Sequence, residues 1–358
     1  MFTKQTESLF IFFCFCYNEL GSDNMPTIRD IAKLANVSPA TVSRVLNNDE
    51  SIQIPAKTKK RIFEAAEKLA YTKHRHKRRV KPDNKRIAII HWYTIEQEVN
   101  DPYFISIRMG IQHECQENDL DFDVIYNDQH IRKNIASKDY HGVIVLGTFD
   151  DETKDFVESI HENVVYANTR DMRFNYDSVH VDFRSLTRHV LRYLLSKNHK
   201  KIGYLGGREY IKSTKEFRVD PRELEFQEVM YQNNLYESKY FKVGQYSIES
   251  GYTLANKLIN ENHENLPTAL FCGNDSIAIG ATRAIQEHKL KIPDDVAIFS
   301  VNDIPTLQYT SPSLSTVKIY TEFMGALAVR LLVEQMNNER ELKVSVLVPY
   351  ELIFRESA

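Results

Sequence analysis

The sequence predicts a chain of two parts: a small all-α head, followed by an α/β core made of two parallel-sheet lobes. Three observations predict it. Two short amphipathic helices joined by a tight turn fit residues 28–46. From Arg86 onward, short apolar runs alternate with helical stretches, which is typical of parallel sheets wrapped in helices. The charge also changes along the chain: residues 25–86 hold 16 Lys and Arg against 6 Asp and Glu, whereas residues 87–358 hold 29 against 40.

The first 24 residues differ from the rest of the chain. Their apolar run, Leu9 to Tyr17, is too short to span a membrane and lacks the basic flank and cleavage site of a signal peptide. We expect residues 1–24 to be a misannotated or non-native extension, with the natural start at Met25. The 4 cysteines are scattered and fit neither a disulfide framework nor a zinc site. We therefore expect a cytoplasmic protein with no metal, no cofactor and no membrane contact.

The head is expected over residues 25–71. The apolar residues that can bury one face of its first helix are Ile28, Ile31, Ala32 and Ala35. Asn36 lies where the chain must turn, and asparagine tolerates the left-handed backbone conformation. Ser38 can cap a second helix, whose first turn accepts Pro39 because that position needs no amide hydrogen. A third amphipathic helix fits residues 57–70.

The exposed face of the second helix carries small or hydrogen-bonding side chains. They are Pro39, Ala40, Thr41, Ser43 and Arg44. A helix in the DNA major groove needs such a face, because bulk would hold it away from the base edges. Spacing alone fits an ordinary helix hairpin equally well.

The run IRDIAKLANVSPATVSRVLN, residues 28–47, resembles the helix-turn-helix of the lactose/galactose repressor (LacI/GalR) family. The likeness continues through KTKKRIFEAAEKLAY and nearly the whole remaining chain. The resemblance implies a transcriptional regulator that binds double-stranded operator DNA. Thr27 and Asn47 join the five residues of the second helix as expected DNA contacts.

Residues 72–86 form the most basic stretch of the chain and also fit a solvated linker. In the family, the matching segment is a hinge that becomes helical on DNA and inserts an apolar side chain into the minor groove. The resemblance places Val80 at that wedge position, with Arg78 before it. Lys73 and His74 replace the usual Pro-Asn, so the register of the hinge stays open. Neutralisation of phosphates by basic residues does not depend on that register.

The resemblance also implies a core like that of a periplasmic binding protein, with a chain that crosses between the lobes three times. We assign residues 87–183 and 318–342 to the first lobe, and residues 184–317 and 343–358 to the second. The expected strands are 87–92, 142–146, 164–167, 201–205, 268–272 and 296–301. The expected helices are 185–197, 223–232, 250–259, 276–288 and 322–336. Since no leucine heptad follows the core, we expect a homodimer rather than a tetramer.

Ligands of open parallel sheets bind beyond the carboxyl ends of the strands. Short amide or carboxylate side chains follow four expected strands, at Asp101, Asn168, Asn274 and Asn302. Such planar groups suit the hydroxyls of a sugar, and aromatic rings supply the apolar half of a sugar site. The aromatic candidates are Tyr103, Phe104 and Tyr246.

Arg222 matches the family's effector-contacting arginine in the pattern D-x-R-x-x-x-F, although Glu225 stands where relatives usually have glycine. Asp275 and Asp303 lie at expected helix starts or turns. Each is either a cap or a ligand contact.

The leading hypothesis is a dimeric repressor that releases its operator when galactose or a galactoside binds between the lobes. The motifs NDPYF, GGRE, SGY and VNDIP resemble those of galactose-operon and β-galactosidase-operon repressors. A regulator of the same fold that responds to a purine corepressor or a phosphoprotein stays open. An enzyme is not expected, because the 12 histidines are scattered and form no evident nucleophile–base pair. A transport-type binding protein would not need the basic head.

Overall fold

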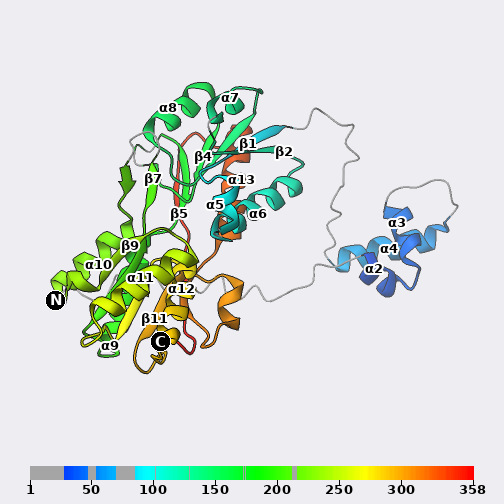
Figure 1. Cartoon of the computed structure of the whole chain (residues 1–358). Coiled ribbons are helices and arrows are strands. Elements are labelled where there is room, and N and C mark those ends of the chain that lie inside the picture. The colour runs from blue at the N-terminus through cyan, green and yellow to red at the C-terminus, as the bar shows by residue number, and fades with distance from the viewer. Residues whose placement is uncertain are drawn as a thin grey trace, which may run out of the picture. The chain divides into compact units, whose positions relative to one another are not determined.

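The computed structural model describes residues 28–46, 54–69, 85–100, 102–128, 130–171, 173, 175–211 and 216–358. The chain forms two compact units, Met1–Pro82 and Asp83–Ala358 (Figure 1). The head lies in the first unit and the two-lobed core in the second. Within the described ranges, no helix is both long and apolar enough to cross a bilayer.

The described residues of the head form three helices: α2 (Ile28–Ala35), α3 (Pro39–Leu46) and α4 (Ala56–Lys68). Their apolar faces meet in a small core of Ile31, Ala32, Ala35, Val42, Val45, Ile62, Ala65 and Ala66. This core explains the helical spacing of the apolar residues in the sequence, because each helix contributes one buried face.

The turn between α2 and α3 has the predicted geometry. Asn36 has a φ of 48°, which is the left-handed conformation. The Ser38 hydroxyl accepts a hydrogen bond from the Thr41 amide at 3.1 Å and thereby caps α3. Arg61 of α4 donates to the carbonyl of Ala35 at 3.0 Å, so the third helix also fixes the end of the first.

The first lobe of the core contains a six-stranded parallel sheet in the order β13-β5-β4-β3-β1-β2. Its strands are β1 (Arg86–His91), β2 (Asp121–Tyr126), β3 (Gly142–Leu146), β4 (Val164–Ala167), β5 (Asp177–His180) and β13 (Ser345–Leu347). Its helices are α5 (Ile95–Asn100), α6 (Pro102–Glu117), α7 (Ile131–Ile135), α8 (Asp151–Ile160) and α13 (Thr321–Met336). Strands β3 and β4 are buried along their whole length, as parallel strands covered on both faces should be.

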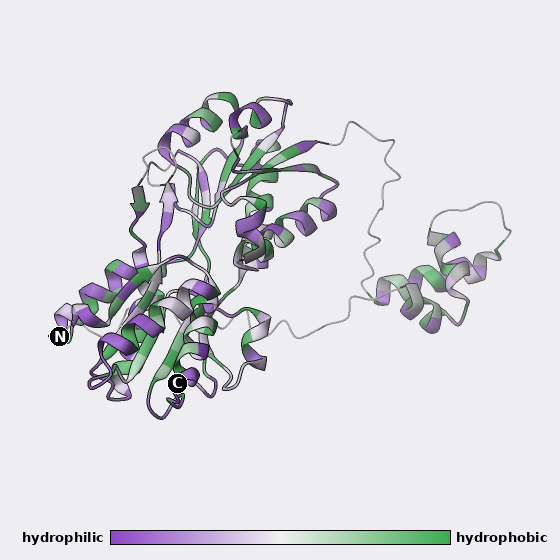
Figure 2. Ribbon diagram, viewed as in Figure 1, coloured by the Kyte–Doolittle hydropathy of each residue, from purple (hydrophilic) through white to green (hydrophobic). Residues whose placement is uncertain are grey.

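The second lobe contains a six-stranded sheet in the order β14-β12-β11-β10-β6-β9. Its strands are β6 (Ile202–Gly207), β9 (Phe241–Gly244), β10 (Ala269–Cys272), β11 (Ala297–Asn302), β12 (Ser315–Ile319) and β14 (Tyr350–Ile353). Its α-helices are α9 (Phe183–Ser196), α10 (Pro221–Gln232), α11 (Ile248–Glu261) and α12 (Asp275–Glu287), and short 3-10 turns span Ser238–Tyr240 and Pro305–Tyr309. Strand β14 pairs antiparallel with β12, and the other neighbours are parallel. In Figure 2 the strands of both lobes carry much of the hydrophobic colour.

A two-stranded antiparallel hairpin, β7 (Glu209–Ile211) and β8 (Glu216–Arg218), is inserted between β6 and α10. It belongs to neither six-stranded sheet. Figure 1 shows β7 above the second lobe, on the side that faces the first.

The chain crosses between the lobes after β5, after β12 and between β13 and β14, which agrees with the three crossings that the resemblance implied. Two assigned boundaries were wrong. Residues 345–347 pair with β5 and so extend the sheet of the first lobe, not the second. Residues 318–319 complete β12 of the second lobe, not the first. The apolar run VSVLV, residues 344–348, is typical of a strand but carries no information about which sheet accepts that strand.

Candidate functional site

A cavity of about 790 Å³ lies between the two lobes of the core, at the carboxyl ends of their strands. Seven residues proposed from the sequence line it: Tyr103, Phe104, Asn168, Arg222, Tyr246, Asn274 and Asn302. The first three come from the first lobe and the other four from the second. The eighth, Asp101, lies outside the described residues.

Arg222 is held in the wall of the cavity by a dense set of contacts. Its Nε and Nη2 atoms donate to the two carboxylate oxygens of Asp220 at 2.7 and 2.8 Å. Nη1 donates to the carbonyl of Gly273 at 2.6 Å, and Nη2 also donates to the hydroxyl of Tyr246 at 2.7 Å. The guanidinium lies over the rings of Phe183 and Tyr246, at 4.5 and 4.9 Å from their centroids.

The local sequence explains this placement. Asp220 caps α10 by accepting a hydrogen bond from the Arg222 amide at 2.8 Å, and Pro221 occupies the first turn. Burial alone would raise the pKa of Asp220, but the Arg222 guanidinium and the surrounding hydrogen bonds hold that pKa below its usual value. The pair is therefore ionised and oriented at neutral pH.

The ring of Tyr246 lies against Gly207 at the end of β6. A Cβ atom at Gly207 would come within 2.7 Å of that ring, so only glycine leaves room for it. The Tyr246 hydroxyl donates to Asp220 at 2.7 Å. Gly207 thus allows the Tyr246 ring to pack against the end of β6.

Asn274, rather than Asp275, caps α12. Its carboxamide oxygen accepts a hydrogen bond from the Ile277 amide at 2.9 Å, and its side chain also lines the cavity. Asp275 is fully buried and accepts hydrogen bonds from the Ser300 and Thr316 hydroxyls at 2.5 and 2.8 Å. Desolvation raises the pKa of the Asp275 carboxyl to about 7. Asp275 is therefore neither a helix cap nor a cavity contact. Its hydrogen bonds join α12 to β11 and β12.

Asn302, at the end of β11, has a φ of 125° and lines the cavity. Its neighbour Asp303 forms an ion pair with Arg355 at 2.6 Å and does not line the cavity. Asp303 therefore has neither of the roles that the sequence left open, cap or ligand contact. Its ion pair connects the end of β11 to the C-terminal segment.

The first lobe presents aromatic rings and an amide to the cavity. The Tyr103 hydroxyl donates to the Asn168 carboxamide oxygen at 2.6 Å, which joins α6 to the end of β4. Phe104 packs edge-on against Tyr103 and Tyr93, with centroids 5.3 and 4.5 Å apart. Asn168 has a φ of 61°, so the chain turns sharply as it leaves β4.

Behind this aromatic wall lies a buried polar cluster. His91 accepts a hydrogen bond from the Tyr93 amide at 3.0 Å, and its Nε2 atom is 3.2 Å from the carboxylate of Glu98. Glu98 is held by Arg108 at 2.6 Å and by the Tyr126 hydroxyl at 2.9 Å. Burial lowers the pKa of His91 to about 4, because desolvation outweighs the nearby Glu98 charge. The imidazole is therefore neutral and fixes the position of Tyr93.

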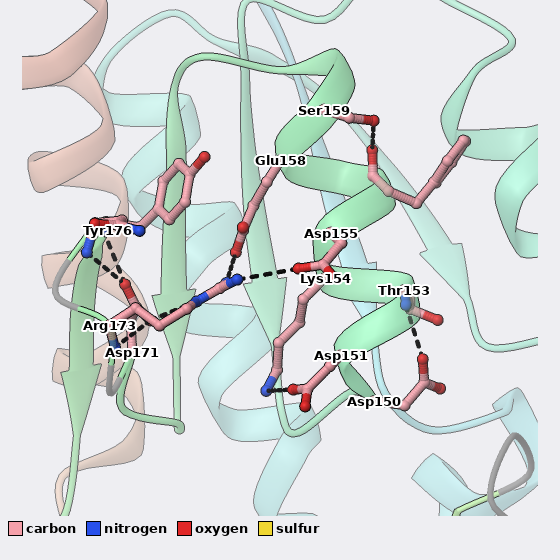
Figure 3. A network of polar contacts seen from close by, with 12 residues as sticks. Asp150, Asp151, Thr153, Lys154, Asp155, Glu158, Ser159, Asp171, Arg173 and Tyr176 are labelled. Atoms are coloured by element: carbon pink, nitrogen blue, oxygen red, sulfur yellow. Dashed lines mark hydrogen bonds and ion pairs between the residues drawn. The ribbon is translucent and has the colours of Figure 1, made fainter.

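The loop that follows Asn168 carries two further lining residues, Thr169 and Arg170. Its conformation is set by Asp171, whose carboxylate accepts hydrogen bonds from the amides of Arg173, Asn175 and Tyr176 at 3.0, 2.8 and 3.0 Å. Figure 3 shows the Arg173 guanidinium reaching across to Asp155 and Glu158 of α8. This network holds the loop against the first lobe.

The predicted DNA contacts that the structure describes lie on α3. Pro39 and Arg44 are exposed, Thr41 is half-buried, and Val42 and Val45 face the core of the head. No ion-pair partner of Arg44 is found among the described residues. Ala40 and Ser43 belong to the same helix. Thr27, Asn47, Arg78 and Val80 lie outside the described residues, as does most of the basic stretch 72–86.

Comparisons with known proteins match the head and the core to two different family models. The model of bacterial regulatory proteins of the lacI family matches residues 27–74, and that of the periplasmic binding protein-like domain matches residues 191–358. The HTH-type transcriptional repressor MelR of Bacillus subtilis (strain 168) is 36% identical over 341 residues, which cover 93% of this chain and 97% of MelR. The regulator GanR of the same organism is 37% identical over 336 residues, which cover 93% of this chain and 99% of GanR. The chain belongs to the lacI family.

This lacI-family chain is a DNA-binding transcriptional repressor with a helix-turn-helix head and a two-lobed core. A solved structure, the transcriptional regulator CelR-cellobiose complex, superposes with a TM-score of 0.67 at 20% identity, over 93% of this chain and all of that one. These relatives are regulators rather than enzymes. Among the described residues, no three His, Cys, Asp or Glu side chains lie close enough together to hold a metal ion.

Several lining residues of this lacI-family cavity were missed in the sequence. Thr148 lies just beyond the end of β3, and Thr169 and Arg170 lie just beyond the end of β4, so the strand-end rule that selected Asn168 also applies to them. His180, Val181 and Asp182 follow or end β5, which the sequence analysis did not recognise. Glu209 and Arg218 belong to the β7–β8 hairpin, for which no strand signal was identified, and Val219 follows it.

Proposed function

We propose that this repressor binds galactose or a galactoside in the cavity between its lobes, and that the bound sugar lowers its affinity for operator DNA. One observation carries the proposal: hydrogen-bonding side chains and aromatic rings from both lobes converge on the same cavity. Each sugar hydroxyl both donates and accepts, and the faces of a sugar ring are apolar, so such a lining suits a sugar.

The hydrogen bonds within the protein leave suitable groups for a ligand. A guanidinium has five N–H donors, and four contacts with Asp220, Gly273 and Tyr246 leave one N–H of Arg222 on Nη1. The carboxamide oxygens of Asn168 and Asn274 are engaged by Tyr103 and Ile277, which leaves their NH2 groups to donate to sugar oxygens. The CelR-cellobiose complex supports the choice of a sugar, and the motifs shared with galactose-operon repressors support galactose.

A ligand held by both lobes can control DNA binding only if it prefers one arrangement of the core. Tyr103 and Asn168 belong to the first lobe, whereas Arg222 and Asn274 belong to the second. A sugar that contacts all four is sensitive to the distance between the lobes, so it can favour an arrangement with low operator affinity. The working unit proposed is a homodimer whose paired heads bind an inverted repeat.

Calorimetric titration of the full chain with galactose, lactose and a nucleobase tests this proposal. We expect the galactosides to bind and the nucleobase not to bind. Arg222→Ala should weaken sugar binding at least about 100-fold, because a charge-assisted hydrogen bond and its orienting network are lost together. The matched control is Arg283→Ala, which removes an arginine that is exposed on α12 and pairs with Glu287.

Two outcomes would contradict the proposal. If the Arg222→Ala and Arg283→Ala variants bind the sugar equally tightly, the sugar does not bind at Arg222 in this cavity. If the nucleobase binds and the sugars do not, the alternative is favoured: a regulator of the same fold that responds to a purine corepressor.

A further inference from the structure

The β7–β8 hairpin adds a second set of groups to the cavity, beside those that surround Arg222. The hairpin is inserted between the end of β6 and the start of α10, the helix that carries Arg222. Three of its residues or neighbours line the cavity: Glu209, Arg218 and Val219. None of them belongs to the amide and aromatic set that we propose for galactose.

The two faces of the hairpin differ. Glu209 lies directly opposite Arg218 in the antiparallel register, so both side chains project from the same face. Tyr210 lies opposite Phe217, and their exposed rings contact each other on the other face, with centroids 5.3 Å apart. The face toward the cavity therefore carries a carboxylate and a guanidinium, and the face away from it carries the aromatic pair.

The base of the hairpin is fixed to the second lobe. Arg208, the residue before β7, donates from Nε to the buried carboxylate of Glu223 at 2.8 Å and from its amide to the carbonyl of Gly244 at 3.0 Å. At the other end, Asp220 is tied to Arg222 by their ion pair. Both ends of the insertion are thus anchored on α10, the helix that carries Arg222.

The volume of the cavity exceeds what one hexose requires. Cavities of about 300–1,000 Å³ hold ligands of drug size, and 790 Å³ lies in the upper part of that range. A hexose has only twelve non-hydrogen atoms, whereas a disaccharide has twenty-three. A single ring at Arg222 leaves space for a second ring toward the hairpin.

The charges on the hairpin indicate what this second ring is. The Glu209 carboxylate repels an anionic group of a ligand at this position, and the Arg218 guanidinium repels a cationic one. Together the two side chains offer acceptors and donors with no net charge, which suits the hydroxyls of a neutral sugar. Resting on the proposed function, we infer that the effector is a neutral disaccharide or longer galactoside whose second ring binds Glu209 and Arg218.

Titration of the full chain with galactose and with galactose-containing disaccharides tests this inference. We expect at least one of lactose, melibiose and galactobiose to bind about ten-fold or more tightly than galactose, the value of one charge-assisted hydrogen bond. Arg218→Ala and Glu209→Ala should each remove most of that margin and leave the affinity for galactose unchanged. The matched control is Phe217→Ala, an equal truncation to alanine on the opposite face of the hairpin, which should keep the margin.

The contrary outcomes separate this inference from the proposed function. If galactose binds as tightly as every disaccharide, there is no second subsite at the hairpin, while the proposed galactose site is unaffected. The same follows if Phe217→Ala removes the margin as fully as Arg218→Ala, or if galactose 6-phosphate binds more tightly than the neutral disaccharides. Failure of every sugar to bind would overturn both proposals.

Discussion

Arg222 and Asp220 form a two-point ion pair at the start of α10, with Nε–Oδ1 and Nη2–Oδ2 distances of 2.7 and 2.8 Å. The same carboxylate accepts a hydrogen bond from the Arg222 amide and thereby caps the helix. One aspartate thus fixes both the direction of α10 and the plane of the guanidinium that it presents to the cavity. Both side chains are largely buried, so their charges depend on each other.

Removal of the Asp220 charge should therefore be costly. Asp220→Asn keeps the size of the side chain and its ability to cap the helix, but it leaves the Arg222 guanidinium buried without a counter-charge. We expect the free energy of unfolding to fall by about 3 kcal/mol. Chemical denaturation of the full chain, monitored over the core transition, measures this loss.

The control is the half-exposed pair of Arg86 and Asp121, whose atoms are 3.4 Å apart. Asp121→Asn should cost much less than Asp220→Asn, because solvent screens the exposed pair. Equal losses for the two variants would mean that burial does not determine the strength of the Asp220–Arg222 interaction.

Arg44 should support operator binding without affecting the sugar site. It is exposed on α3, on a different face from the buried Val42 and Val45. Arg44→Ala should weaken binding to an operator duplex, selected from random DNA by the full chain, by about 10- to 100-fold. Fluorescence anisotropy at fixed salt measures this change, and calorimetry should find sugar affinity unaltered. Unchanged operator affinity would place the DNA-binding face elsewhere on the head.

Asp275 should make stability depend on pH. Its folded pKa is about 7, well above the value of an unfolded aspartate. Below about pH 4 the carboxyl is protonated in both states, and its stabilising effect is complete. As the pH rises toward 7 the unfolded chain releases a proton that the folded chain retains, so this contribution falls by about 1.4 kcal/mol per pH unit and is lost above pH 7.

The variant Asp275→Asn isolates this effect. An asparagine oxygen can still accept from the Ile304 amide, which lies 2.8 Å from the carboxylate, and its NH2 group can donate to the hydroxyls of Ser300 and Thr316. We expect the variant to lack the fall seen in the wild type when unfolding free energies are compared from pH 5 to pH 8. Parallel profiles for the two proteins would show that Asp275 ionises alike in the folded and unfolded states.

The helical head and much of the sheet framework could be predicted because their signals are local. The left-handed Asn36 and the Ser38 cap follow from residue chemistry within a few positions. Strands β3 and β4 have the predicted bounds because both consist of apolar residues bordered by polar ones. Strands β5 and β9, with the sequences DSVH and FKVG, were missed because short, partly polar strands lack such a run.

The cavity could be predicted only in part for a related reason. The strand-end rule selected Asn168, Asn274 and Asn302 because each ends a recognisable apolar strand or lies within two residues of its end. The role of Asp275 depends on Ser300 and Thr316, which lie 25 and 41 residues further along the chain. No local pattern contains such partners, and the same holds for Glu209 and Arg218, whose hairpin forms outside both sheets.

The most direct test of the central claim is the affinity of the full chain for its selected operator, measured without a galactoside and with a galactoside at a concentration that just saturates the wild type. Our account predicts that the galactoside lowers this affinity in the wild type and has no effect on Arg222→Ala. Operator affinity that stays unchanged or becomes tighter when the sugar binds would contradict a repressor that galactosides release from DNA.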